Sequence, residues 1–173
     1  MIPECEKLNL DLYRFEAIFD TFGHTGCFKS HTELLRLVKD DGIFMIIEDD
    51  IKVLQPRGVL DKAISQLPDD WDMLYLGAHL SKKLQRYSEN LFVLSGALMT
   101  HAVIYNNQNG VVDYILEHAR GIIDVYMRDN VHDKFNCYLT YPMVCSQSDG
   151  YSDTTRWWKQ SVDIEKAYDK YTV

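Results

Sequence analysis

The amino-acid sequence predicts a single α/β domain in which helices flank a mostly parallel sheet. Apolar runs of strand length alternate with segments whose apolar residues recur at helical spacing, as in layered α/β proteins. The chain has 173 residues, 46% of them hydrophobic and 12% aromatic, so it can bury a sizeable core. No repeat or linker divides it. We expect one domain over residues 1–173, with an atypical N-terminus at 1–14 and a C-terminal tail at 156–173.

Three helices are expected from apolar stripes. Residues 27–41 carry apolar side chains at helical spacing, His31 lies on the same stripe, and Gly42 follows as a typical residue after a helix end. A second helix, at 58–67, follows a proline, and a third is expected at 108–120.

Four segments are predicted to form strands, and they alternate with those helices. They are 43–49, 72–77, 91–105 with a break at Ser95-Gly96, and 135–147 with Pro142 at an end or edge. Ligands of such sheets bind beyond the carboxyl ends of the strands.

Composition excludes several classes of protein. The net charge of -8 argues against binding to nucleic acid or to a membrane surface, which both require basic patches. The start of the chain lacks the pattern of a signal peptide, and no apolar run reaches the length of a membrane span. The four cysteines show no zinc spacing and no CxxC pair, which indicates isolated reduced thiols. We expect a cytoplasmic protein.

The stretch "GIFMIIEDDIKVL" (42–54) places three carboxylates directly after a strand that we expect to be buried on both faces. Glu48, Asp49 and Asp50 raise one another's pKa unless a cation intervenes. Mg²⁺ and Mn²⁺ prefer such oxygen ligands, usually one or two carboxylates together with substrate phosphates. A solvated acidic turn is the alternative. A phospho-accepting receiver domain is disfavoured, because Asp72 stands at the wrong end of its strand.

Six short motifs occur in an order and spacing that resemble the family 25 glycosyltransferases. That family includes the lipopolysaccharide-core and collagen hydroxylysine galactosyltransferases. The motifs are "GCFKSH" (26–31), "IIEDD" (46–50), "WDMLYLG" (71–77), "LMTHAVIYNNQN" (98–109), "IDVYM" (123–127) and "SDGYSD" (148–153). The resemblance covers residues 15–155. It implies a GT-A-like fold and inverting, metal-assisted transfer of galactose or glucose from a UDP-sugar to a glycan or a hydroxylated protein.

The acidic motif matches the position of the metal-binding motif of that family. The resemblance implies that Asp50 ligates Mn²⁺ or Mg²⁺, and that Glu48 or Asp49 faces the ribose or metal-bound water. The bound metal would stabilise the leaving UDP as a Lewis acid.

Asp124 matches a family aspartate and is the first candidate for the general base that takes the proton of the acceptor hydroxyl. A helix N-cap is the alternative role for this residue. Asp153 is a rival base, and Asp149 a further candidate for the metal or the diphosphate. Both belong to a glycine-containing turn.

The motif "GCFKSH" supplies three further candidates for the donor site. His31 and Ser30 match the family element, although a buried core histidine is the plainer interpretation of His31. Gly26 lies near the expected helix start, where the backbone could approach a phosphate.

The first strand of the family, which helps to hold the uridine, has no counterpart in residues 1–22. The sequence therefore leaves three alternatives open: a shortened enzyme, a fragment of one, or a non-catalytic relative that has lost donor binding and acts by binding or scaffolding. The retained acidic triplet favours the enzyme.

Overall fold

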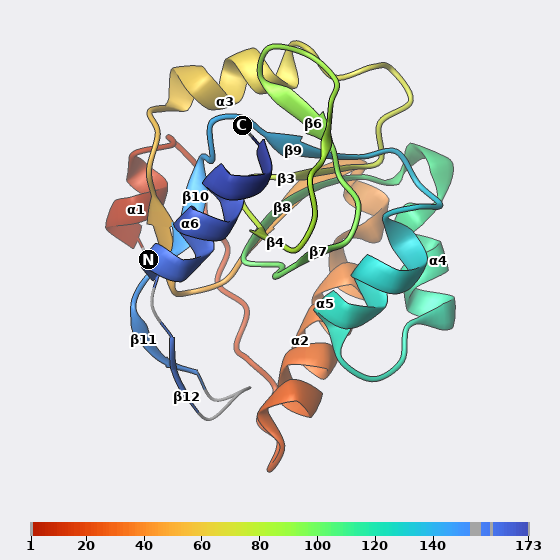
Figure 1. Ribbon diagram of the computed structural model, residues 1–173. Coiled ribbons are helices and arrows are strands. Elements are labelled where there is room, and N and C mark those ends of the chain that lie inside the picture. Colours follow the sequence, from red (N-terminus) through yellow and green to blue (C-terminus); the bar gives the residue numbers. More distant parts are fainter. Residues whose placement is uncertain (1, 153–156, 160, 173) are drawn as a thin grey trace.

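A mixed six-stranded sheet forms the centre of the molecule (Figure 1). The computed structural model describes residues 2–152, 157–159 and 161–172. The strands lie in the order β1-β8-β3-β9-β6-β5. Their bounds are Ile43–Ile47 (β1), Met73–Tyr75 (β3), Gln85–Arg86 (β5), Leu91–Val93 (β6), Ala102–Asn106 (β8) and Cys137–Thr140 (β9).

The expected mostly parallel sheet is wrong. Only β3 and β9 pair in parallel, and the other neighbouring pairs are antiparallel. The reason lies in the connection between β3 and β8, which holds short strands and no helix. Without a helical crossover, the chain returns as an antiparallel neighbour of β3. The α/β class itself is confirmed.

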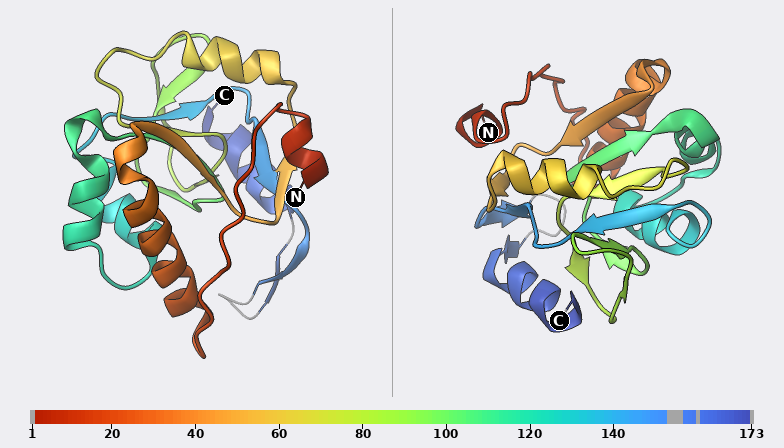
Figure 2. Two further views of the ribbon diagram at one scale, coloured as in Figure 1. Left: turned by 180° about the vertical axis from the view of Figure 1, so that it is seen from behind. Right: turned by 90° about the horizontal axis from the view of Figure 1, so that it is seen from above.

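Helices cover both faces of the sheet (Figure 2). Their bounds are Ile2–Glu6 (α1), Gly23–Val38 (α2), Arg57–Ile64 (α3), Val111–His118 (α4), Ile123–Tyr126 (α5) and Ser161–Thr172 (α6). Single turns follow or precede some of them, at Lys39–Asp41 (η1), Asn107–Asn109 (η2) and Met127–Val131 (η3, a π-helix).

The period of two along the strands divides the core into two clusters. Met73 and Tyr75 face a cluster that α2, α4, α5 and α6 complete, whereas Leu74 and Leu76 face α1 and α3. Each sheet face is therefore covered. β1 is nonetheless an edge strand: Ile46 is buried, Ile43 is 56% exposed and the other three residues are half-buried, so the expected burial of this strand on both faces is wrong.

Three two-stranded ribbons complete the fold. They pair Ile51–Val53 (β2) with Cys145–Gln147 (β10), His79–Leu80 (β4) with Ala97–Leu98 (β7), and Gly150–Ser152 (β11) with Trp157–Lys159 (β12). The segment 135–147 is thus two strands, β9 and β10, with Pro142 between them. The segment 91–105 is three strands, and Gly96 lies in the break with φ 66°.

The three helices expected from apolar stripes are present at the expected places, but their lengths differ from the expected ones. α2 begins four residues before the expected start, and Gly42 follows η1 with φ 78°, as expected of a residue after a helix end. The atypical N-terminus forms α1, and Leu8 after it is fully buried in the cluster beneath α3.

Candidate functional site

The three acidic residues form the turn between β1 and β2. The carboxyl ends of β1 and β3 and the amino end of β8 meet at this edge, because β8 runs antiparallel between the other two. The register pairs Ile47 with Ala102, so Glu48 falls opposite His101. Its backbone N–H donates to the His101 carbonyl at 2.8 Å. The sheet thereby fixes where the turn begins.

The Glu48 carboxylate contacts three side chains. Its Oε1 accepts from Thr100 Oγ1 at 3.0 Å and lies 3.4 Å from His31 Nε2. Its Oε2 accepts from Gln147 Nε2 at 3.1 Å. These partners come from α2, β10 and the residues before β8, so Glu48 joins three elements that are distant in sequence.

His31, which is buried, and Glu48, which is half-buried, form an ion pair. Burial alone would lower the pKa of His31, but its interactions with Cys27 and Glu48 outweigh burial and raise that pKa to about 10. Burial alone would also raise the pKa of Glu48, but the hydrogen bond and the charge of His31 lower it to about 2. Near neutral pH the pair is therefore imidazolium and carboxylate. A protein cation thus offsets one of the three negative charges.

Asp49 and Asp50 are more accessible than Glu48. Asp49 is exposed and Asp50 half-buried. Asp50 Oδ1 accepts from Gln147 Nε2 at 3.3 Å, and its carbonyl accepts from the backbone N–H of Ser148 at 2.6 Å. Ser148 leads directly to Asp149, which is exposed beside this turn. Of the two candidates in "SDGYSD", Asp149 is thus near the acidic turn, and Asp153 lies outside the described residues.

Asp124 is hydrogen-bonded to Met99, which precedes β8 at the same edge of the sheet. Asp124 is the second residue of α5, and the N-cap is Ile122, so the N-cap alternative is wrong. Asp124 Oδ2 accepts from the backbone N–H of Met99 at 3.3 Å, and its Oδ1 accepts from that of Val125 at 2.8 Å. Met99 has φ 80°, an uncommon conformation for a residue with a side chain.

The segment Met99–Thr100–His101 is therefore the link between two of the predicted motifs. Its first residue binds Asp124, its second binds Glu48 by its side chain, and its third binds Glu48 by its backbone. The segment lies inside the motif "LMTHAVIYNNQN" that carries part of the resemblance. That motif is the only feature of the sequence that pointed to Thr100 as a site residue. No feature of the sequence pointed to Gln147.

Gly26 and Ser30 contact the N-terminal segment. The Ser30 hydroxyl accepts from the backbone N–H of Ile18 and donates to the Gly26 carbonyl, each at 2.8 Å. A Cβ on Gly26 would lie 2.8 Å from the Ile18 carbonyl oxygen. Both residues therefore fasten the segment before α2 to that helix.

A divalent metal fits the acidic turn only if a second ligand, such as a diphosphate, completes its coordination. Among the described residues, no three His, Cys, Asp or Glu side chains are grouped so that they could hold a metal ion. Mg²⁺ and Mn²⁺ often use only one or two carboxylates plus substrate phosphates. Asp49 and Asp50 could supply such a pair, and a diphosphate would have to complete the site.

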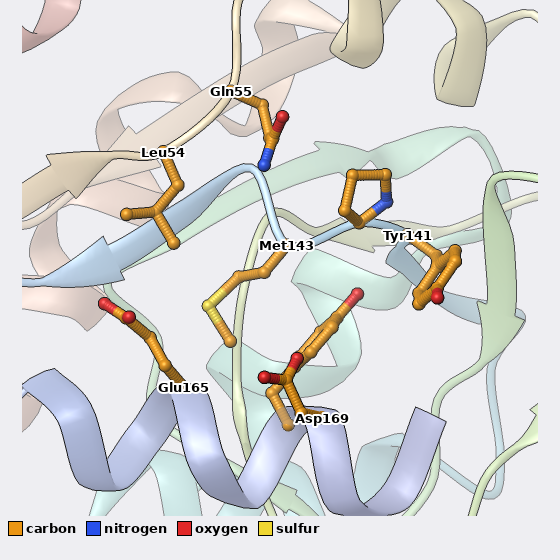
Figure 3. Close-up of a pocket in the computed structure, with 8 residues that line it drawn as sticks. Leu54, Gln55, Tyr141, Met143, Glu165 and Asp169 are labelled. Carbon is orange, nitrogen blue, oxygen red and sulfur yellow. The ribbon is translucent and has the colours of Figure 1, made fainter. Parts of the chain in front are cut away.

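A groove of about 180 Å³ lies elsewhere, between α6 and the chain around β2 and β10 (Figure 3). Tyr141, Met143, Glu165 and Asp169 are among its lining residues. Glu165 is paired with Lys52 at 3.2 Å. The groove contains none of the predicted site residues.

Comparison with known protein families finds no match to this chain, and no curated protein matches it. In the part of the chain that the structure describes, no helix is both long and apolar enough to cross a membrane.

Proposed function

We propose that this protein is a metal-dependent, inverting glycosyltransferase that moves a hexose from a UDP-sugar to an acceptor hydroxyl. The proposal is supported by the resemblance to family 25 and by one structural observation. The segment 99–101 bonds both Glu48 and Asp124, so the expected metal motif and the expected base share one edge of the sheet. We expect galactose or glucose as the sugar, and a glycan or hydroxylated protein as the acceptor.

Each residue has a distinct task under this proposal. Asp49 and Asp50 would hold the metal with the donor diphosphate, where the metal acts as a Lewis acid on the leaving group. Glu48 is already bonded to His31, Thr100 and Gln147. It therefore orients the turn. Asp124 would accept the proton of the attacking hydroxyl, with its carboxylate held by the two backbone N–H groups of Met99 and Val125.

The metal and the nucleotide should stabilise the protein only together. Because two carboxylates alone make a weak site, Mn²⁺ or UDP added singly should shift the melting temperature little. Added together they should shift it clearly, and EDTA should abolish the gain. Asp49→Asn/Asp50→Asn should lose this response. The matched control is Asp40→Asn/Asp41→Asn, which removes the same charge at the other end of β1. Equal stabilisation by UDP with and without metal would contradict the metal role.

Asp124→Asn tests the base. We expect transfer to fall by about 10²–10⁴-fold, while the response to UDP and Mn²⁺ stays near that of the wild type. Asp129→Asn, an exposed acid on the following turn, should keep both. Loss of nucleotide binding in the Asp124 variant would assign that residue to the structure of the site instead.

A non-catalytic binding protein is the second candidate. The observation that favours it is the lack of a three-residue metal cluster among the described side chains. On either proposal we expect weak nucleotide binding, worth about 4–6 kcal/mol, with poor discrimination between UDP and GDP. Calorimetry with both nucleotides and Mn²⁺ measures this. Sugar transfer that depends on Asp124 would separate the enzyme from the binding protein.

A further inference from the structure

The groove between α6 and the chain around β2 and β10 combines an apolar floor with an acidic rim (Figure 3). Met143 lies along the floor and is 4% exposed, and the buried Tyr168 ring lines the groove as well. Glu165 and Asp169 stand one turn apart on α6, so their carboxylates lie on the same side of this helix, toward the groove. The groove is therefore apolar at its floor and negatively charged along one rim.

The two carboxylates of this rim are only partly neutralised. Glu165 Oε1 lies 3.2 Å from Lys52 Nζ, and the Lys52 side chain is 46% exposed, so water screens this pair. In the described part of the chain, no ion pair joins the exposed Asp169 to a basic side chain. Like charges four residues apart on a helix repel each other. A further cation in the groove would remove that repulsion.

Tyr141, which lines the groove, is already in contact with a guanidinium of the chain itself. The guanidinium carbon of Arg86 lies 4.7 Å from the centre of the Tyr141 ring and 4.9 Å from that of Phe92. Aromatic rings attract cations because their faces carry partial negative charge. The Tyr141 ring is nearly parallel to that of Tyr168, at 8°, and both line the groove. These surroundings suit a planar cation on an apolar stem.

We propose that this groove binds an organic cation on an aliphatic stem, of the kind that an arginine side chain presents. The stem would lie on Met143 and Leu54. The guanidinium would lie between the Glu165 and Asp169 carboxylates, which accept its N–H groups. Gln55, on the opposite wall, has no hydrogen-bond partner among the described residues, so its carboxamide is left for the ligand.

The size and charge of the groove favour this class of ligand. Its volume of about 180 Å³ admits one long side chain. A neutral ligand such as a sugar would leave the repulsion between the two carboxylates in place. The proposal does not depend on glycosyl transfer, because no residue of the acidic turn lines the groove.

The test uses the whole chain with methyl-labelled methionine and follows the NMR signal of Met143, assigned with Met143→Leu. Acetyl-arginine methylamide should shift this signal with a dissociation constant in the millimolar range, as expected of so small a ligand. Acetyl-citrulline methylamide has nearly the same shape but no charge, and should bind about tenfold more weakly. Equal binding of the two probes, or a shift of the signal by glucose, would overturn the proposal.

Butylguanidinium, which lacks the peptide groups, distinguishes two sources of the cation. Tighter binding of acetyl-arginine methylamide would indicate an arginine of a protein partner. Equal binding would indicate a free alkylguanidinium compound. Failure of both guanidinium probes to shift the Met143 signal would overturn the proposal.

Glu165→Gln/Asp169→Asn tests the acidic rim and should keep the fold, since neither side chain is buried. This variant should bind the arginine probe about tenfold more weakly and lose its preference over citrulline. The matched control is Asp113→Asn/Glu117→Gln, which removes the same charge from the exposed face of α4 and should bind like the wild type. Lys52→Met removes the cation that competes for Glu165, so it should bind the arginine probe more tightly. An unchanged preference for arginine in the acidic-rim variant, or weaker binding in Lys52→Met, would overturn the proposal.

Discussion

Two buried histidines of this protein differ in charge near neutral pH: one ring is positively charged and the other is neutral. His31, on α2, lies against the Glu48 carboxylate, and its pKa is raised to about 10. His132, just after the π-helix η3, lies 3.0 Å from the Tyr75 hydroxyl, and burial lowers its pKa to about 4. Both are at most 7% exposed. The partner therefore decides the charge, and a charged buried histidine marks the edge of the sheet that bears the acids.

Removal of His31 should give the largest effect in this comparison. His31→Leu leaves the Glu48 carboxylate without its cation, so we expect the free energy of unfolding to fall by about 3 kcal/mol. Chemical denaturation at pH 7 measures it. The double variant His31→Leu/Glu48→Leu should recover part of the loss, since an apolar pair replaces the ion pair while Thr100 and Gln147 lose Glu48 as their acceptor. A fall of under about 0.5 kcal/mol in the single variant would show that the pair is unimportant.

Alkaline pH should weaken the wild type through His31. A folded pKa above the unfolded value of 6.5 gives stability that is complete below pH 6.5 and is lost as the pH rises toward 10. The loss should reach up to about 1.4 kcal/mol per pH unit. Between pH 6.5 and about 8 the buried thiols contribute little, because a thiol of the unfolded chain ionises only near pH ~8.5. Denaturation of the wild type and His31→Gln in this window should therefore give a falling and a flat curve.

Mild acid should also weaken the protein, in this case through His132. Its folded pKa is below the unfolded value, so its contribution is present above pH 6.5 and lost as the pH falls from 6.5 toward 4. His132→Leu should flatten the stability curve between pH 6.5 and 4.5, and should lose about 1 kcal/mol at pH 7 because Tyr75 loses its partner. His132→Leu/Tyr75→Phe should restore that loss. If the stability of His132→Leu still falls between pH 6.5 and 4.5, a titratable group other than His132 causes the loss.

The sequence allowed prediction of the elements better than of their arrangement. The apolar stripe of α2, the run of β1 and the glycine after η1 follow local rules of periodicity and chain reversal, and these were confirmed. The antiparallel place of β8 between β1 and β3 was missed, because pairing depends on contacts between segments about 30 and 60 residues apart. The propensities of residues in a short segment do not depend on such distant contacts, so they could not predict the pairing.

The candidate site was also predictable only where a local sequence pattern marked its residues. The triplet 48–50 stands out because an apolar strand precedes it, and Asp124 was proposed from a motif. The partners Thr100 and Gln147 are ordinary polar residues whose importance comes only from the sheet register and the β2-β10 ribbon. The plain interpretation of His31 as a core histidine was correct about its burial, but the ion pair with Glu48 could not be inferred from helical spacing.

The edge position of β1 affects how its backbone exchanges protons with solvent. The Glu48 amide donates to His101, and hydrogen-bonded pairs alternate along an antiparallel ladder. Alternate amides of β1, those of Met45 and Ile47 among them, therefore point away from β8, toward a side where no described strand pairs with it. Within one apolar strand, protected and unprotected amide protons should thus follow each other residue by residue. The acidic turn stands at the end of a strand that is anchored along one side only.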